Sequence, residues 1–240
     1  MRDNIYSSEQ NDVKDFTFDT TVVEVFPDMI QRSVPGYSTI ISTIEKLTET
    51  FHQENTNLYD LGCSLGAATL SMRKAVSKNN CKIIGIDNSQ AMVDKCRLHI
   101  KAYKSDVPVE ITMADILEYP VKNASVIVMN FTLQFIPQQQ RQALIDKLCQ
   151  ALVPGGVLIL SEKLQWQESN INDVINNLHL DFKRANGYSE LEISQKRSAI
   201  ENVMKIDTEQ THLTRLKQAG FSGASTWYQC FNFASFIAIK

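Results

Sequence analysis

Short runs of residues that are apolar almost throughout recur along the chain from residue 57 onward. Between them, apolar residues return every three or four positions, which is the period of a helix with one buried face. Near-continuous apolar strands separated by helices are typical of a mostly parallel sheet that helices cover on both faces. The pattern therefore predicts an α/β fold with strands at about Asn57–Leu61, Lys82–Ile86, Val109–Met113, Ser125–Asn130 and Val157–Leu160.

The helices that alternate with these strands are bounded by capping and helix-breaking residues. A helical region begins at Val22, and we expect Pro27 and then Pro35-Gly36 to break it before a second helix that ends near Phe51. Further helices are predicted over about 67–76, 90–102 and 138–152, with Ser89 as the N-cap of the second and Pro154-Gly155-Gly156 after the third. Residues 1–20 are expected to be loosely ordered, so that 21–240 form a single domain.

The pattern changes after the fifth predicted strand. A helix near 213–220 precedes a segment rich in aromatic and β-branched residues, which predicts two strands joined at Phe231-Asn232-Phe233. Before that helix lies a mostly polar insertion, at about 165–207, which has helical spacing and a capping-box pattern starting at Ser189. Because an insertion after the carboxyl end of a strand lies where ligands bind in such folds, we expect this insertion to form a lid.

A glycine-rich turn between the first strand and its helix is the strongest indication of a ligand. It runs Asp60-Leu61-Gly62-Cys63-Ser64-Leu65-Gly66, and Asp87 ends the next strand. Glycine lets the backbone approach a ligand closely, and the first N–H groups of the following helix face that ligand. An acid at the tip of the second strand is placed to bind two ribose hydroxyls. Together these features predict a nucleoside ligand, although the loop alone is also compatible with a tight turn that binds nothing.

Three further polar residues lie near the expected binding edge. Asp115 follows the third strand and Asn130 ends the fourth, although Asp115 would equally serve as a helix N-cap. Tyr37, which precedes a long helix, is suited to stacking over a ligand or donating a hydrogen bond, and a core tyrosine fits the pattern as well.

Arg197 interrupts an apolar helical face. On a helix that starts at Ser189, it shares one side with Ile193, Ile200 and Met204. An unpaired buried charge is costly, and a guanidinium matches a carboxylate through two hydrogen bonds. The partner is a ligand carboxylate or a protein acid, unless the side chain reaches water.

The composition restricts the class of substrate. The 240 residues carry a net charge of −3, without the basic excess usual in a protein that binds tRNA by itself, so a small-molecule substrate is favoured. No run of ~18 apolar residues is present, and the polar N-terminus does not resemble a signal peptide, which predicts a cytoplasmic protein without a membrane anchor. The five cysteines and four histidines are scattered without metal-ligand spacing, so no metal site is expected.

The glycine-rich loop resembles that of class I S-adenosylmethionine (SAM)-dependent methyltransferases, usually Asp-x-Gly-x-Gly-x-Gly, with Ser64 where the middle glycine is usual. Longer segments resemble the carboxy-S-adenosylmethionine synthase family in particular, and Ser64 fits the loop of that family. The resemblance runs from about Phe16 to the C-terminus and is carried by residues 25–37, 59–70 and 181–197. It implies a Rossmann-like class I methyltransferase fold whose last strand is antiparallel.

The resemblance also implies a reaction. The family uses SAM as a substrate and prephenate as the carboxyl donor, and produces carboxy-SAM and phenylpyruvate. A partner enzyme, a tRNA carboxymethyltransferase, then transfers the carboxymethyl group to hydroxyuridine at the tRNA wobble position, giving uridine 5-oxyacetic acid. The family implies a homodimer, and direct nucleic-acid binding is not expected.

Carried over residue by residue, the resemblance makes Arg197 the anchor of the new carboxylate and places Asp115 at the adenine amino group. The ligand contacts that it implies are Tyr37, Gly62, Cys63, Ser64, Asp87, Asn88, Asp115, Ile116, Asn130 and Arg197.

No residue stands out as a catalytic base, and the implied chemistry does not require one. Prephenate becomes aromatic when it loses its ring carboxylate, releasing carbon dioxide and hydroxide. The hydroxide can deprotonate the SAM methyl group, which the sulfonium makes weakly acidic, and the ylide can trap the carbon dioxide. The protein then orients the reactants and excludes water. An ordinary methyltransferase acting on a small molecule or tRNA, and a non-catalytic SAM-binding subunit, remain alternatives.

Overall fold

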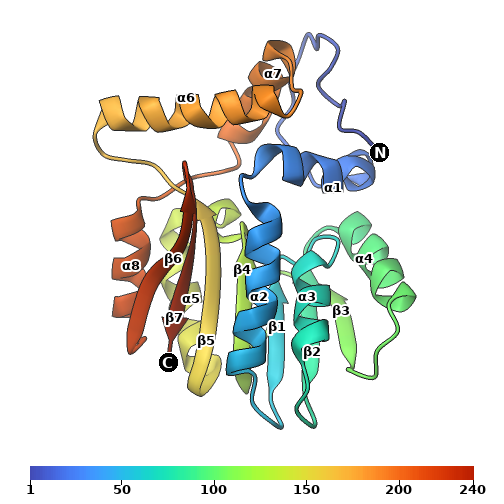
Figure 1. Ribbon diagram of the computed structural model, residues 1–240, viewed down its shortest axis with the longest axis vertical. Coiled ribbons are helices and arrows are strands. Elements are labelled where there is room, and N and C mark those ends of the chain that lie inside the picture. The colour runs from blue at the N-terminus through green and yellow to red at the C-terminus, as the bar shows by residue number, and fades with distance from the viewer.

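The computed structural model describes residues 1–240 and contains one seven-stranded sheet in the order β3-β2-β1-β4-β5-β7-β6 (Figure 1). In this order, the first five strands, from β3 to β5, are all parallel to one another. The strand β7 pairs antiparallel with both β5 and β6. The predicted α/β architecture, including the antiparallel last strand, is confirmed. The strands are β1 (Asn57–Leu61), β2 (Lys82–Asp87), β3 (Val109–Met113), β4 (Ala124–Asn130), β5 (Leu152–Lys163), β6 (Gly223–Cys230) and β7 (Phe233–Ile239).

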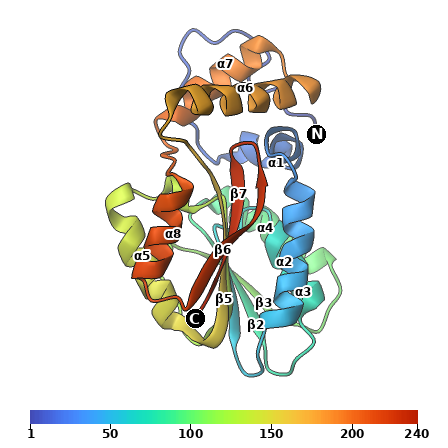
Figure 2. The same cartoon turned by 60° about the vertical axis from the view of Figure 1, so that its left-hand side comes forward.

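Helices cover both faces of the sheet (Figure 2). Successive strand residues alternate between two apolar clusters: Leu58 packs with α2 and α3 on one face, and Tyr59 packs with α5 and α8 on the other. The central strands are apolar throughout because both their faces are buried. The covering helices are α2 (Tyr37–Phe51), α3 (Ala67–Ala75), α4 (Gln90–Ala102), α5 (Gln138–Ala151) and α8 (Glu209–Gln218), with a short 3₁₀ turn at Leu133–Phe135.

The predicted C-terminal strands form a hairpin whose turn contains Phe231 and Asn232. Phe231 adopts a left-handed backbone conformation (φ 51°), which such a short reversal requires. The returning strand β7 lies between β5 and β6, so the last residues of the chain complete the sheet.

The polar insertion folds into two helices, α6 (Ser169–Ala185) and α7 (Glu190–Glu201), which lie beyond the carboxyl ends of the parallel strands beside α1 (Thr20–Ser33) (Figure 1). The predicted capping box is present: the Ser189 hydroxyl accepts the Glu192 N–H, and the Glu192 carboxylate accepts the Ser189 N–H. None of the helices combines the length and apolar character needed to cross a bilayer.

The residues before α1 contain no helix or strand, but they do make specific contacts. Asp3 is only 2% exposed, and its carboxylate accepts the Tyr188 hydroxyl and lies 3.4 Å from the Lys196 ammonium. Arg32 donates to the Asp3 carbonyl at 3.2 Å and stacks over the Tyr188 ring. The segment expected to be loosely ordered thus contacts both α1 and the insertion.

The prediction that Pro27 breaks the first helix was wrong. α1 continues through Pro27 from its N-cap Asp19, which accepts the N–H groups of Thr21 and Val22. A proline inside a helix costs ~3 kcal/mol. Four buried apolar side chains on α1 outweigh that cost, since each contributes about 1.5–3 kcal/mol. They are Val22, Val23, Val25 and Met29.

The fifth strand is longer than the apolar run indicates. It begins at Leu152, directly after α5, so Pro154-Gly155-Gly156 lie within it. These residues form an irregularity in the pairing with β4, and Gly155 has a φ of 74°. Two backbone hydrogen bonds with Lys240 replace the regular ladder there.

Asp207 fastens the end of the insertion to the core. Its Oδ2 lies 2.7 Å from Arg141 Nη1, on α5, and 2.9 Å from Arg215 Nη2, on α8. Arg141 is fully buried and Asp207 is 7% exposed. Burial alone would raise the pKa of the Asp207 carboxyl, but the two guanidinium groups lower it below its ordinary value. The ionised carboxylate therefore compensates two enclosed cations.

We predict that Asp207→Asn lowers the free energy of unfolding by about 3–5 kcal/mol, because it leaves buried guanidinium charge without its counter-ion. Since the pKa of Asp207 is lowered by folding, its contribution is complete above the pKa of the unfolded chain and is lost as the pH falls through the folded value. Urea titrations at pH values from 7 to 3 should therefore show that the free energy of unfolding falls less steeply with decreasing pH in the variant than in the wild type.

Asp181→Asn is the matched control, because Asp181 pairs with Arg184 on an exposed surface. It should change stability by less than ~1 kcal/mol. An equal loss in both variants would contradict the role assigned to Asp207.

Candidate functional site

A cavity of about 1060 Å³ lies between the carboxyl ends of the strands and the helices α1, α6 and α7. The structure brings every ligand contact predicted from the sequence to its wall. These residues are Tyr37, Gly62, Cys63, Ser64, Asp87, Asn88, Asp115, Ile116, Asn130 and Arg197.

The glycine-rich loop turns sharply over one side of this cavity. Gly62, Ser64 and Gly66 all have positive φ, at 83°, 49° and 86°. A Cβ on Gly62 would lie 2.3 Å from the Thr132 hydroxyl, so that position requires glycine. Ser64 tolerates its left-handed conformation at a cost, which explains why glycine is usual there in related loops.

The Asp87 carboxylate, at the tip of β2, stabilises this loop. Its Oδ2 accepts the Ser64 N–H at 2.9 Å, and its Oδ1 accepts the Ser89 N–H at 2.9 Å. Burial raises the pKa of Asp87, and the hydrogen bonds partly offset that effect. Each carboxylate oxygen can accept a second hydrogen bond, so the group can still receive two hydroxyls from a ribose.

Two buried acceptors without a donor lie at the tips of β1 and β4. Asp60 is 1% exposed; its Oδ2 accepts the Thr69 hydroxyl at 2.6 Å, whereas its Oδ1 has no partner. Asn130 Oδ1 also has no partner. Burial raises the pKa of Asp60 to about 6. A ligand ammonium, which has three N–H donors, suits this pair of acceptors.

The far end of the cavity, beside β3, suits an aromatic ring. Ile116 is buried there, and Phe18 makes edge contacts with Phe26 and Phe135 along the wall. Asp115 is exposed at the rim, where its Oδ1 accepts the Leu117 N–H at 2.9 Å. No helix follows Asp115, so the helix N-cap considered for it is absent; the side chain caps a turn instead, and its other oxygen remains available.

Tyr37 and Cys63 line the cavity without the features of reactive groups. Burial and the neighbouring Asp60 raise the pKa of the Tyr37 phenol, so it stays protonated and can donate a hydrogen bond. A hydrogen bond with Cys96, together with burial, raises the pKa of the Cys63 thiol. Cys63 is therefore not a nucleophile.

Arg197 lies on the cavity wall rather than in a packed core. Ile193 and Ile200 share its face of α7 as expected, whereas Met204 lies beyond the end of that helix; all three line the cavity. The Arg197 side chain is exposed there, and it forms no ion pair with any acid of the chain. The protein-acid alternative is thereby removed.

A group of cationic residues that the sequence analysis missed lines the same side of the cavity. Lys163 ends β5, Lys183 lies on α6, and Lys196 lies next to Arg197 on α7. Burial lowers their pKa values, to about 8, 7 and 8 respectively. The position of Lys163 could have been found from the sequence, because it follows an apolar strand at the same edge as Asp60 and Asp87.

Charge therefore changes from one end of the cavity to the other in the order of the strands. Asp115 follows β3, Asp87 ends β2, Asp60 lies on β1, Asn130 ends β4 and Lys163 ends β5. The acidic end suits a nucleoside carrying an ammonium, and the basic end suits an anion.

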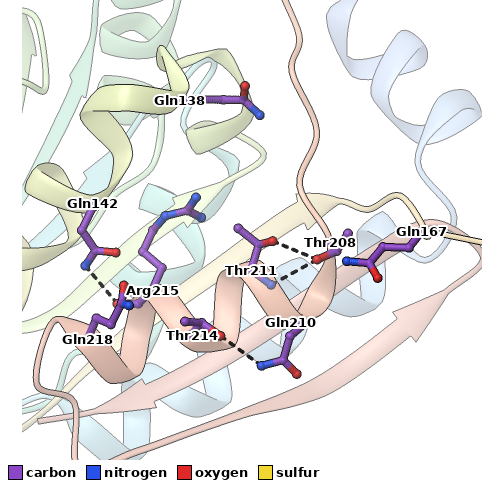
Figure 3. A pocket seen from close by; sticks show the side chains of 9 residues that line it. All are labelled: Gln138, Gln142, Gln167, Thr208, Gln210, Thr211, Thr214, Arg215 and Gln218. Atoms are coloured by element: carbon purple, nitrogen blue, oxygen red, sulfur yellow. Dashed lines mark hydrogen bonds between the residues drawn. The ribbon is translucent and has the colours of Figure 1, made fainter.

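A second hollow, of about 340 Å³, lies between α5 and α8 (Figure 3). No hydrophobic residue lines it, and its side chains largely bond one another or nearby backbone: Thr208 pairs with Thr211, and Gln210 with Thr214. None of the predicted site residues lies there, so it is not the candidate site.

Comparison with known proteins agrees with this geometry. The carboxy-S-adenosyl-L-methionine synthase of Pseudoalteromonas translucida is 62% identical over 240 residues, covering 100% of this chain and 99% of the relative. That of Colwellia psychrerythraea is 60% identical over 238 residues, covering 99% and 98%. The chain belongs to the carboxy-S-adenosyl-L-methionine synthase family. It is accordingly a transferase-type enzyme.

The family model described as a methyltransferase domain matches residues 58–156, which include the glycine-rich loop and β1 to β4. A putative SAM-dependent methyltransferase from Methanococcus maripaludis shares the fold, with a TM-score of 0.60 at 17% identity over 97% of both chains. Human N-acetylserotonin methyltransferase in complex with SAM aligns with a TM-score of 0.62 at 16% identity, over 92% of this chain and 55% of the other.

The residues present fit SAM. The free acceptors of Asp60 and Asn130 suit its α-ammonium, Asp87 suits its ribose, and the apolar end beside Ile116 suits its adenine.

We predict that Asp87→Ala weakens SAM binding by about 2–4 kcal/mol, because it removes a charged acceptor of two hydroxyls and the anchor of the Ser64 N–H. Calorimetric titration measures the affinity, and a melting curve verifies that the variant is folded. Asp94→Ala is the control, since Asp94 lies on α4 outside the cavity and should leave affinity unchanged. Unaltered SAM affinity in folded Asp87→Ala protein would refute the assignment.

Proposed function

We propose that this chain converts SAM and prephenate to carboxy-SAM, phenylpyruvate and water. The observation that carries the proposal is the charge order of the cavity. Carboxylates lie at the tips toward β3, and at β5 and the insertion four cations outnumber the two acids Asp173 and Glu201. SAM is a cation at its sulfonium and ammonium, and prephenate is a dianion. A single cavity with opposite charge at its two ends suits this pair of reactants better than SAM with a neutral acceptor.

In the proposed reaction the protein holds two reactants in contact and keeps water out. The acidic end binds SAM, and the basic end binds the donor with its ring carboxylate directed at the methyl group. Arg197 lies free on the wall and is suited to receive the carboxylate that the product acquires. His179, the only histidine near the basic end, has a pKa lowered to about 3 by burial and the neighbouring lysines, so it is neutral and weakly basic. Hydroxide released from the donor remains the proposed base.

The proposed product is the carboxymethyl donor for uridine 5-oxyacetic acid at the tRNA wobble position. This role requires a separate tRNA carboxymethyltransferase to consume it, and no direct contact of this chain with nucleic acid. The cations that would attract an anion lie inside the cavity, which favours a small anionic substrate over a tRNA backbone.

We also propose that the chain acts as a homodimer. The apolar stripe of α6 supports this arrangement, because Ile171, Val174 and Leu178 are 45%, 56% and 41% exposed on one helix. Exposed apolar patches of this kind mark protein interfaces.

The donor can be tested directly. Incubated with SAM and prephenate, the purified protein should form phenylpyruvate and carboxy-SAM in a 1:1 ratio, measured by mass spectrometry as a product heavier than SAM by one carbon dioxide. With SAM alone it should not methylate bulk tRNA. Efficient tRNA methylation without prephenate would favour an ordinary methyltransferase, and no turnover of any kind would favour a non-catalytic SAM-binding subunit.

Arg197→Ala should reduce affinity for carboxy-SAM much more than for SAM, because only the product has the carboxylate that Arg197 is proposed to hold. A charge-assisted bidentate pair contributes about 2–4 kcal/mol, so the selectivity should fall by roughly 30-fold or more. Arg197→Lys should restore only part, since an ammonium lacks the planar fork.

Arg184→Ala serves as the control for Arg197→Ala. Arg184 lies on the same insertion, pairs with Asp181 and Glu190 at the surface, and does not line the cavity. Parallel titrations of SAM and carboxy-SAM into both variants decide the point. Equal losses for the two ligands in Arg197→Ala would contradict the proposed contact.

A further inference from the structure

Two lysines on the cavity wall have no hydrogen-bonding or ionic partner within the protein. Lys183 is only 9% exposed, and Lys163 is half-buried at the end of β5. The Nζ atom of neither residue makes a hydrogen bond or an ion pair with any group of the chain, although both residues line the cavity. Neither ammonium is fully buried, because both open into the cavity. Lysines withdrawn this far from solvent are still normally paired, because removing charge from water costs several kcal/mol.

Their neighbour Lys196 shows what a structural lysine looks like in this region. Its ammonium lies 3.4 Å from the Asp3 carboxylate and 3.2 Å from the Ser33 hydroxyl, and its role is to hold the N-terminal segment against α7. Neither Lys163 nor Lys183 is held in this way; the Lys183 ammonium lies 5.8 Å from the centroid of the Tyr188 ring, a weak contact that does not compensate its charge.

The charges around these two lysines further disfavour their protonated forms. Burial is the main cause that lowers the pKa of Lys183, followed by repulsion from Lys196, Lys163 and Arg197, and only Asp3 opposes it. For Lys163, burial acts first and Arg197 second, with Glu201 in opposition. The neighbouring His179 donates its Nε2–H to the Ser33 carbonyl and is neutral, so it offers no compensation. The cluster has more positive than negative charge, and a bound anion would compensate the excess.

We propose that Lys163 and Lys183 form an anion subsite that holds the carboxylate which the carboxyl donor retains after the reaction. The inference rests on the proposed function and deepens it by dividing the two carboxylates of the donor between different residues. The ring carboxylate is transferred and ends beside Arg197 on α7. The side-chain carboxylate stays with phenylpyruvate, between the tip of β5 and α6.

This division explains why the cations come from separate elements. A transferred carboxylate must leave the donor, so its anchor has to be distinct from the group that retains the donor. Two point charges on flexible stems suit a carboxylate that is only held, whereas the planar fork of Arg197 suits a carboxylate that must be received in one orientation.

The first test uses Lys183→Met and Lys163→Met, which keep the side-chain volume and remove the charge. Each should raise the KM for prephenate by about 10- to 100-fold, as loss of a charge-assisted hydrogen bond does. SAM affinity should be unchanged. The Tm of each variant should be equal or higher, because an unpaired buried charge has been removed.

Lys46→Met is the charge-matched control, since Lys46 lies on the exposed surface of α2 and pairs only with Glu49. It should leave the KM for prephenate unchanged. A fall in Tm together with weaker prephenate binding in the Lys183 and Lys163 variants would show a structural role and overturn the inference. An unchanged KM for prephenate in both variants would overturn it as well.

A second test does not depend on turnover. Phenylpyruvate, titrated calorimetrically into the wild-type protein, should bind, and Lys183→Met and Lys163→Met should each weaken it by about 10-fold or more, whereas Arg197→Ala should not. The neutral methyl ester of phenylpyruvate should bind weakly and equally to all four proteins. Equal phenylpyruvate affinity in the wild type and the lysine variants, or a loss confined to Arg197→Ala, would overturn the assignment of the subsite.

The two tests separate failure of the inference from failure of the proposed function. If the wild type converts prephenate and the lysine variants do so with unchanged KM, the function stands and the subsite is wrong. If the wild type makes no carboxy-SAM from prephenate but binds phenylpyruvate in a lysine-dependent way, the anion subsite stands and prephenate is not the donor.

Discussion

All parallel strands of a sheet end at the same edge, and this constraint determines where the chemistry of this protein lies. Asp87, Asn130 and Lys163 are far apart in the sequence, yet each terminates a strand and so reaches the same cavity. The strand order then arranges them by charge, because the acidic tips belong to the β3-β2-β1 half and the basic tip belongs to β5. The topology alone therefore produces a cavity that is negative at one end and positive at the other. The insertion between β5 and α8 closes this cavity from above and increases the positive charge.

Several residues around this cavity are in local environments that reduce the stability of the fold. Ser64 has a left-handed backbone, Asp60 and Asn130 leave acceptors without donors, and Lys183 is enclosed without a counter-ion. Each feature reduces stability in isolation and each faces the same space, which is how binding sites commonly differ from the rest of a fold. The surrounding structure compensates with fully paired groups outside the cavity, of which Asp207 between Arg141 and Arg215 is the clearest case.

Local patterns predicted most of the fold, and the family resemblance supplied the full set of ten residues that the structure places on the cavity wall. The strands, the Ser89 cap and the loop at Gly62 depend on neighbours in the chain, so the sequence displays them directly. The prediction of a helix break at Pro27 was wrong because burial of a whole helix face stabilises the helix by more than one lost hydrogen bond destabilises it. That burial depends on tertiary packing, which the local sequence does not show. The alternatives for Arg197 stayed open because helical periodicity identifies a shared face but does not show whether that face meets protein or a cavity. Lys183 and Lys196 were missed for the same reason, since only the folded insertion shows which of its many charges point inward.

The contact between Asp3 and the insertion has a consequence for the order in which the chain assembles. Asp3 and Lys196 are 193 residues apart in the sequence, so their contact closes a very long loop. Contacts with so large a sequence separation form late, because the entropy of closing the loop must be met first. The central strands β1, β2 and β4 lie closer together in the sequence, so they pair at a lower loop entropy than α7 and its N-terminal partner do. The part of the cavity wall that Asp3 and Lys196 hold together should therefore form after the central strands have paired.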